Sequence, residues 1–406
     1  MAILGMWVWP QNVNLRGAER VVRSCRQAGV TDLFFLTKGL GGEASYHSRV
    51  APRGYERDLL REITDCAHKH GMRVHAWFTS TCDAYYKRQH PESGRCHFVR
   101  GRDRELISLR DDGYLNYMET VIREVCSRYE VDGLHLDYIR YNHLLYGWAD
   151  EDMERYQAEG ASKACLHALI QHAYQAGEYR NEDVLLDAYR DGDENLRAFA
   201  RARRKDVECF ASALTAAAHA ERKDIILSAA LMPEGAYADT AFSDLHYGQN
   251  YEDATKLYDY ALPMAYSTAY GKDAAWVRHV AEGTVQHNIK TIVGLHAYEG
   301  GSGLALQADI NMLQGVPVEG ICLFREGATA LAGMDGRKLC LYNALDEAIT
   351  CVSITNGTEE AALRTEIPAD ETQQINLPFE PEAVRVLAGK AERCVYVTKE
   401  LFDMQS

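Results

Sequence analysis

The sequence lacks long apolar runs, an excess of basic residues and closely paired cysteines. No uncharged apolar stretch reaches the roughly 18 residues that a membrane-spanning helix needs, so we expect no membrane partner. Asp and Glu number 59 against 44 Lys and Arg, which gives a net charge of −15. This acidic balance argues against a nucleic-acid partner, because phosphate binding needs basic surface. The basic segment 201–205 is interpreted as a solvated helix face.

The 11 cysteines are an odd number and contain no C-x-x-C pair. Most of them lie in apolar segments, as small core residues do. No Lys or Arg precedes the first apolar run, as it would in a signal peptide. Unpaired cysteines and the missing signal together indicate a cytoplasmic location.

Motifs of several enzyme classes are missing as well. The chain has no G-x-S-x-G turn, no Walker loop and no H-E-x-x-H helix, and Trp9–Asn12 is not the glycine-rich turn that binds dinucleotides. We therefore expect no cofactor and no metal ion. The alternative is a metal site formed by His75, Asp137 and His296 across the ends of strands.

The sequence does contain a repeated alternation of strand and helix. Short apolar, β-branched or aromatic runs occur at Ile3–Trp9, Asp32–Thr37, Arg73–Thr79, Gly133–Asp137, Ile225–Leu231, Tyr260–Tyr266, Thr291–Ala297 and Gly320–Phe324. Segments with the apolar spacing of helices separate them, such as 18–28, 55–69 and 114–129. Strands joined by helical crossovers in this number predict an α/β fold, a closed (β/α)₈ TIM barrel, with an open doubly wound sheet as the alternative.

Two regions depart from the regular repeat. The fourth and fifth strands lie far apart, so we place a long insertion at about residues 142–201, where it would shape the mouth of the barrel. Beyond residue 337 the chain carries β-forming runs separated by turn signals. We therefore divide the chain into a barrel domain, 1–337, and a small β-rich accessory domain, 338–406, whose exposed edge is compatible with a homodimer.

Candidate catalytic residues follow from strand ends, because the C-terminal ends of barrel strands carry the reactive groups. In the segment 131–141, VDGLHLDYIRY, alternation places His135 in the barrel interior and Asp137 at its mouth. A carboxylate there is desolvated, and either chemistry or an ion pair with Arg140 would explain it. Glu234 follows the next strand, and two neighbouring carboxylates could divide the acid and base work of glycoside hydrolysis.

The second carboxylate has alternatives, since Asp83, Glu299 and Glu326 also follow strands and Glu234 could be a plain loop residue. Aromatic rings can stack on sugar faces while polar groups bind sugar hydroxyls, and the chain has 24 Tyr and 5 Trp. The candidate substrate-binding residues share positions at or just beyond strand ends: Trp9, Lys38, Trp77, Arg140, Tyr141, Tyr266, His296 and Glu326.

The segment VDGLHLDYIRY is the most specific of several motifs along the barrel. The others are 5–9 (GMWVW), 74–78 (VHAWF), 247–251 (YGQNY) with 262–266 (LPMAY), 293–295 and 320–324. Over about residues 3–330 the chain thereby resembles bacterial glycoside-hydrolase-like family 10. The resemblance implies a hydrolase barrel with Asp137 as the catalytic carboxylate and Trp77, Arg140 and Tyr266 lining the site. Asn142 stands where the family usually has Pro, and the insertion behind it has its own composition.

These features predict a glycoside hydrolase that cleaves an oligosaccharide or an amino-sugar-containing glycan by carboxylate acid/base catalysis. Asp137 would be the nucleophile or electrostatic partner and Glu234 the acid; a substrate acetamido group oriented by Asp137 could attack instead. The alternatives are a carbohydrate-binding barrel without turnover and a barrel hydrolase or lyase of another class.

Overall fold

Eight parallel strands close into a barrel in the order β1, β10, β9, β8, β7, β6, β3, β2. This architecture comes from a computed structural model that describes residues 3–174 and 181–399. The strands are Ile3–Val8 (β1), Asp32–Lys38 (β2), Arg73–Thr79 (β3), Gly133–Asp137 (β6), Ile226–Leu231 (β7), Tyr260–Ala265 (β8), Lys290–His296 (β9) and Gly320–Phe324 (β10). The predicted fold class is confirmed, and every predicted barrel strand is present close to its expected bounds.

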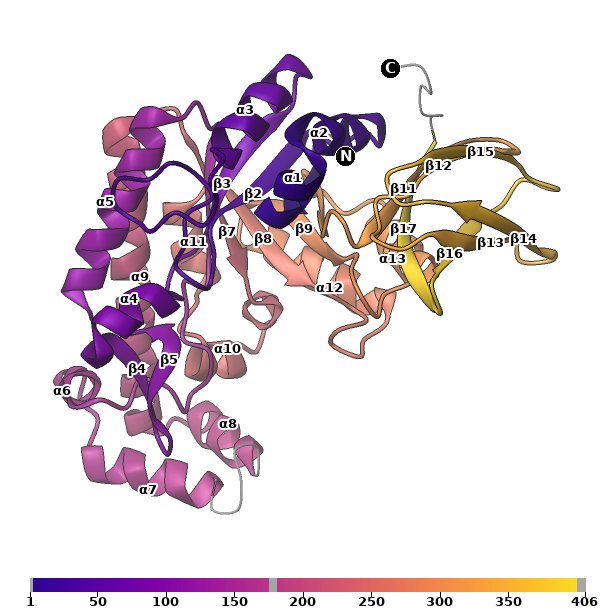
Figure 1. Ribbon diagram of the computed structural model, residues 1–406. Coiled ribbons are helices and arrows are strands. Elements are labelled where there is room, and N and C mark those ends of the chain that lie inside the picture. The colour runs from indigo at the N-terminus through magenta and orange to yellow at the C-terminus, as the bar shows by residue number, and fades with distance from the viewer. Residues whose placement is uncertain (1–2, 175–180, 400–406) are drawn as a thin grey trace.

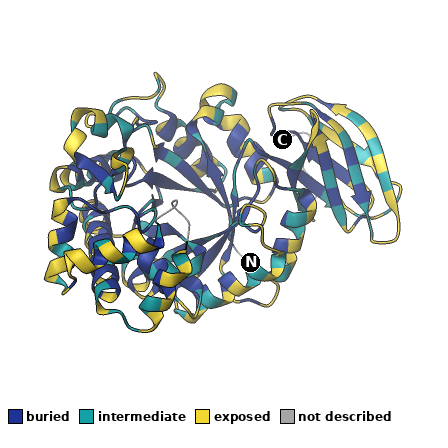
Figure 2. Cartoon of the chain, turned by 90° about the horizontal axis from the view of Figure 1, so that it is seen from below, coloured by how far each residue is buried: buried dark blue, intermediate teal, exposed yellow. Residues whose placement is uncertain are grey.

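Helices surround the barrel (Figure 1). Apolar side chains of these helices belong to the same buried core as the strands. They include α1 (Pro10–Arg16), α2 (Ala18–Gln27), α3 (Leu59–Lys69), α5 (Asp112–Arg128), α11 (Tyr251–Leu257), α12 (Ala274–Gln286) and α13 (Gly303–Met312). On α3, for example, Leu59, Leu60 and Ile63 are fully buried, and each such side chain contributes about 1.5–3 kcal/mol by leaving water. Figure 2 shows buried strands at the centre and exposed outer helix faces. No helix in the described part of the chain combines the length and apolar composition needed to cross a bilayer.

The barrel interior is packed with side chains from alternate strand positions. Trp7 and Trp77 belong to one apolar cluster there, together with Phe34. His135 lies among them, with Trp7 Nε1 donating to its Nε2 at 3.3 Å and Ser228 Oγ 2.9 Å from its Nδ1. The expectation of a hydrogen-bonded interior histidine is confirmed, and burial lowers the pKa of His135 well below its usual value.

The long insertion after β6 forms a helical layer with an apolar core of its own. It contains α6 (Asp150–Ala158), α7 (Lys163–Ala173), α8 (Glu182–Arg190) and the first part of α9 (Glu194–Glu221), and it packs on α10 (Ala241–His246). Residues 175–180 of the predicted insertion lie outside the described residues. The prediction of a solvated basic face at 201–205 was wrong for Arg203, which is buried 3.7 Å from the ring centre of Tyr141 and donates to backbone carbonyls.

A small hairpin between β3 and β6 was not predicted. It follows α4 (Ala84–Gln89) and the short 3₁₀ turn η1 (Pro91–Ser93) and consists of β4 (Gly94–His97) and β5 (Gly101–Ile107). Arg95, fully buried on β4, donates to the carbonyl oxygens of Arg140 and Ile107, both at 2.9 Å. The hairpin thereby supports the loop that follows β6.

The C-terminal region is a seven-stranded sheet at one end of the molecule (Figure 1). Its strands are β11 (Thr329–Asp335), β12 (Lys338–Tyr342), β13 (Ile349–Thr355), β14 (Glu360–Ile367), β15 (Thr372–Asn376), β16 (Ala383–Ala388) and β17 (Ala391–Thr398). The sheet begins ahead of residue 338, and residues 400–406 of the predicted accessory domain lie outside the described residues. The strand-rich character is confirmed, while the division into two domains stays a prediction.

Candidate active site

Asp137 is the last residue of β6 and lies beside Thr79 of β3 in the barrel register. Leu134 and Leu136 point into the layer between strands and helices, so the alternating Asp137 faces the mouth. The next residue, Tyr138, has φ = 58°, a left-handed conformation that is rare for a side-chain-bearing residue. Such strain is often found at functional sites, and here it turns the chain directly after the carboxylate.

Three donors hold the Asp137 carboxylate. Trp77 Nε1 donates to Oδ2 at 3.2 Å, the Tyr138 backbone N–H donates to Oδ1 at 2.6 Å, and Arg140 Nη1 lies 3.3 Å from Oδ1. Burial by itself would lower the pKa of Arg140, but the charge and hydrogen bond of Asp137 together with Tyr138 outweigh burial, and the pKa of Arg140 is raised. Asp137 therefore takes part in the ion pair with Arg140 that we considered as an alternative.

The same carboxylate faces a cavity of about 760 Å³ with largely aromatic walls. The lining residues are Trp7, Trp9, Leu36, Leu40, Trp77, Thr79, Asp137, Tyr138, Arg140, Ala230, Met264, Tyr266 and Phe324. A second hollow of about 1040 Å³ shares Trp9, Leu36 and Leu40 with the first and extends to Glu43 and Arg53. The two adjoin at these shared residues and form a cleft that runs from Asp137 past Trp9.

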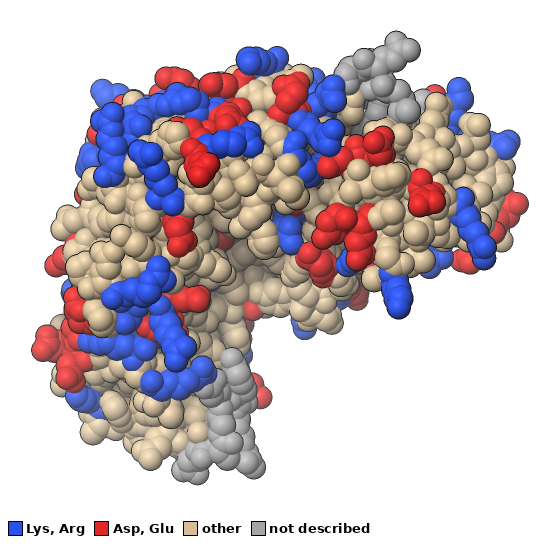
Figure 3. All heavy atoms as spheres, viewed as in Figure 1, with Lys and Arg blue, Asp and Glu red and all other residues tan. Residues whose placement is uncertain are grey.

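Charged side chains are common on the visible face of the molecule and scarce in its central hollow (Figure 3). Figure 3 shows acidic and basic side chains interspersed over the visible face, while its central hollow is formed mainly by other residues. An apolar hollow with few convergent polar groups is the usual composition of a small-molecule or glycan site. The few charged side chains that do line the cavity, Asp137 and Arg140, therefore stand out.

Glu234 lies in the 3₁₀ turn η2 (Pro233–Ala236) that follows β7. Its Oε2 is buried without a hydrogen-bond partner in the described part of the chain, and Tyr247 donates a long hydrogen bond of 3.5 Å to Oε1. Burial raises the pKa of Glu234, and the Tyr247 hydrogen bond and the Arg140 charge offset this rise only in part. Glu234 does not line the 760 Å³ cavity, but Arg140, which does, lies close enough to act on it.

Each of the other three candidate carboxylates forms an ion pair with a cationic side chain. Asp83 is fully buried 2.7 Å from Lys38 Nζ, and it also caps α4 by accepting the Tyr86 N–H at 2.7 Å. Glu299 is exposed and pairs with Arg325 at 2.9 Å. Glu326 is buried, contacts Arg16 and accepts from Asn12 Nδ2 at 2.7 Å. Of the four candidates, Glu234 is the carboxylate that no cation contacts directly among residues 3–174 and 181–399.

The structure brings together some of the predicted binding residues and separates others. Trp9, Trp77, Arg140 and Tyr266 line the cavity with Asp137, whereas Lys38, Tyr141, His296 and Glu326 do not. Tyr141 is buried and donates to Asp206 Oδ2 at 3.1 Å, so it supports the insertion and not a ligand.

His296 lies behind the cavity wall, with its ring centre 6.5 Å from that of Tyr266. Its Nε2 is 3.4 Å from the Glu299 carbonyl oxygen, and burial lowers its pKa. His75 points into the barrel, where its Nε2 lies 2.9 Å from Asp32. The alternative metal site of His75, Asp137 and His296 therefore does not form among the described residues.

Gln249 was not predicted as a site residue, although it connects the two carboxylate-bearing loops. Its Oε1 accepts the Met232 N–H at 2.9 Å, and its Nε2 donates to the carbonyl oxygen of Ile139 at 3.0 Å. The segment YGQNY that contains it served only as a family likeness. A buried amide in a loop between strands was the signal that could have identified it.

Known proteins resemble this chain in sequence and in fold. A sequence model of the glycosyl hydrolase-like 10 family matches residues 42–307. The PgaB (BpsB) glycoside hydrolase domain from Bordetella bronchiseptica superimposes with a TM-score of 0.61 at 12% identity, covering 80% of this chain and 94% of that one.

Two further solved structures are similar to the barrel. The catalytic domain of β-amylase from Paenibacillus polymyxa has a TM-score of 0.57 at 10% identity, covering 80% of this chain and 92% of its own. A β-galactosidase from Marinomonas ef1 has a TM-score of 0.58 at 13% identity, covering 80% of this chain and 54% of its own. At these identities the structural likenesses show the fold. No curated protein matches this sequence.

Proposed function

The chain belongs to the glycosyl hydrolase-like 10 family, and from this we propose that it is a glycosidase acting on an oligosaccharide or an amino-sugar-containing glycan. The observation that carries the proposal is Asp137, a carboxylate held by Trp77, Tyr138 and Arg140 at the floor of an aromatic cavity. Aromatic walls suit the apolar faces of sugar rings, and the carboxylate suits the positive charge that develops at the anomeric carbon.

Glu234 is the proposed proton donor. Because burial raises its pKa, it keeps its proton to higher pH than an ordinary glutamate and can deliver it to the leaving oxygen as the glycosidic bond breaks. Asp137 then stabilises the oxocarbenium charge or forms the covalent glycosyl bond, and water supplies the hydroxyl that completes hydrolysis. Where the substrate carries a 2-acetamido group, that group could attack in place of Asp137, which would orient it.

The extended cleft supports a substrate of more than one sugar unit. Trp9 lies on the boundary of the two hollows, with the Arg325 guanidinium 3.8 Å from its ring centre. Its indole can therefore stack on a sugar next to the scissile bond, while Glu43 and Arg53 offer hydrogen bonds to a more distant unit.

A second candidate function is carbohydrate binding without turnover. One observation favours it: Glu234 does not line the cavity that holds Asp137. In that case the aromatic cleft would bind a glycan, and Arg140 and Asp137 would recognise its hydroxyls.

Activity of the purified protein on a panel of aryl glycosides and amino-sugar oligomers tests the proposal. We expect turnover of at least one substrate, and we expect Asp137→Asn to reduce kcat/KM by at least about 10³-fold while the protein stays folded. Glu299→Gln is a matched control at another strand end and should keep its activity, because that carboxylate is exposed and paired with Arg325. Near-normal rates in Asp137→Asn would refute the assignment, and glycan binding without turnover would favour the second candidate.

A further inference from the structure

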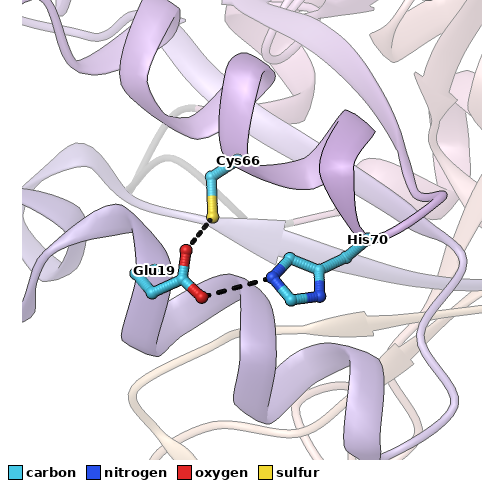
Figure 4. Close-up of side chains that lie close together, drawn as sticks. All are labelled: Glu19, Cys66 and His70. Atoms are coloured by element: carbon cyan, nitrogen blue, oxygen red, sulfur yellow. Dashed lines mark hydrogen bonds and ion pairs between the residues drawn. The ribbon is translucent and has the colours of Figure 1, made fainter.

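A second group of reactive side chains lies on the outer surface of the barrel, where α2 packs on α3. Glu19 is in the first turn of α2, Cys66 is near the end of α3, and His70 caps that helix. Cys66 Sγ donates to Glu19 Oε2 at 3.0 Å, and His70 Nε2 lies 3.3 Å from Glu19 Oε1 (Figure 4). We propose that these three side chains form a binding site for a single zinc ion or a similar divalent transition metal.

The geometry of the three ligand atoms fits this proposal. One ligand atom from each side chain lies within 4.8 Å of the others. In a tetrahedral zinc site with bonds of about 2.0–2.3 Å, neighbouring ligand atoms are about 3.3–3.8 Å apart, so small side-chain rotations suffice. The spacing of Cys66 and His70 by one helical turn places both on one face of α3, and Glu19 approaches from the neighbouring helix.

The chemistry of the three groups selects a class of metal. A thiolate and an imidazole favour zinc or other borderline transition metals over calcium and magnesium, which prefer oxygen ligands alone. Cys66 is buried, while the Glu19 side chain is 65% exposed and that of His70 is 32% exposed. The protein therefore supplies three ligands and leaves an open side at which water can complete the coordination.

Charge in the neighbourhood is compatible with a bound dication. The positive side chains that act on the group are Arg23, toward Glu19, and Lys69, toward Cys66. Once the Cys66 thiol has lost its proton, a zinc ion with one thiolate and one carboxylate forms a neutral group, so Arg23 and Lys69 face no net positive charge. The proton that leaves the Cys66 thiol is released to solvent when the metal–sulfur bond forms.

A different group of metal-ligand type, His143, Glu182 and His246, is less suited to a metal. The His143 Nδ1 accepts the Leu145 N–H at 3.2 Å, and the His246 Nδ1 accepts the Leu144 N–H at 3.4 Å. Each neutral ring therefore carries its proton on Nε2, which points to Glu182. A metal ion bound at this place would have to displace both of these protons. This group stabilises α8 by its own contacts.

Cobalt and zinc titrations of the full-length protein after chelator treatment test the proposal. We expect one equivalent of Co²⁺ to produce the near-ultraviolet absorption of a thiolate–cobalt bond, and Zn²⁺ to remove it by displacement. Cys66→Ser should abolish the band, and His70→Gln and Glu19→Gln should each weaken Zn²⁺ binding by at least about tenfold. Cys209→Ser is the matched control, because Cys209 is an exposed cysteine on α9 outside this group.

Two results would overturn the proposal. One is a folded wild-type protein, judged by circular dichroism, that shows no cobalt–thiolate band. The other is a band that persists in Cys66→Ser. Neither readout depends on glycosidase activity, so the outcome is separate from that of the function proposed above.

Discussion

The two sides of the barrel mouth use charged residues in opposite ways. Beyond β6 and β7, Asp137 and Arg140 face the cavity, and the half-buried Glu234 has a buried Oε2 and no cation in direct contact within the described residues. Beyond β2 and β10, Lys38 is neutralised by Asp83, and Glu326 is neutralised by Arg16. A charged residue at a strand end therefore indicates chemistry when it faces a cavity or lacks a counterion, and not when it is enclosed in an ion pair away from the cavity.

Among variants that compare the two sides of the mouth, Glu234→Gln is expected to change kcat/KM the most. Loss of a general acid should reduce kcat/KM by about 10²–10⁴-fold. The protonated form acts, so wild-type activity should fall as pH rises through the elevated pKa of Glu234, and the variant should lack this alkaline limb. A pH profile of kcat/KM measures both effects. Glu326→Gln, the same change on the other side, should keep the limb; an unchanged profile in Glu234→Gln would contradict the comparison.

On the side of the mouth beyond β2 and β10, Arg16→Met is expected to lower the stability of the protein and to leave its activity unchanged. It leaves Glu326 buried without its cation, which costs about 3–5 kcal/mol in the free energy of unfolding. Urea unfolding measures this loss, while kcat of the folded protein should stay near the wild-type value. Adding Glu326→Gln should recover part of the stability, since it removes the uncompensated charge; no recovery would show that Arg16 acts through other contacts.

Gln249→Ala tests whether the two carboxylate loops depend on each other. Breaking its hydrogen bonds leaves Met232 N–H and the Ile139 carbonyl unsatisfied, at a cost of about 1–3 kcal/mol in stability. Because both loops move, we expect kcat to fall more than KM rises. Gln307→Ala, which removes an exposed helix contact with Asn311, is the control. A change in stability with unaltered kcat would mean that Gln249 does not position the site.

The smallest expected effect concerns the aromatic rim. Trp9→Ala should weaken substrate binding by about 0.5–1.5 kcal/mol, seen as a higher KM, because a stacking surface is lost. Tyr141→Phe should leave KM unchanged, since that hydroxyl contacts Asp206 away from the cavity. Equal effects of the two changes would contradict the division between cavity-lining and buried aromatic residues.

The barrel could be predicted because its signals are local. Each strand is a short apolar run, and the period-2 alternation in 133–137 places Asp137 correctly at the mouth. The strand β14 gives a weaker sequence signal, because its residues include Ala and Glu, which have little β preference. The hairpin of β4 and β5 was missed because it appeared only as a long gap between two barrel strands.

The site could be predicted in part. Trp77, Arg140 and Tyr266 were identified through the family resemblance, and they line the cavity with Asp137. Lys38 and Glu326 also lie at strand ends, but their counterions come from residues far away in the sequence, Asp83 and Arg16. Spacing along a chain carries no information on such distant pairs, so their neutralisation became visible only in three dimensions.

The contacts of Arg16 have a consequence for anyone who wishes to shorten this protein. The same guanidinium that contacts Glu326 beside the barrel mouth also binds Asp370 at 2.6 Å and contacts Tyr342, both in the C-terminal region. A truncation after residue 337 would remove these two anchors and the neighbours of β11 in one cut. The C-terminal sheet thus holds α1 of the barrel through Asp370 and Tyr342, and a shortened protein would need replacement contacts for Arg16.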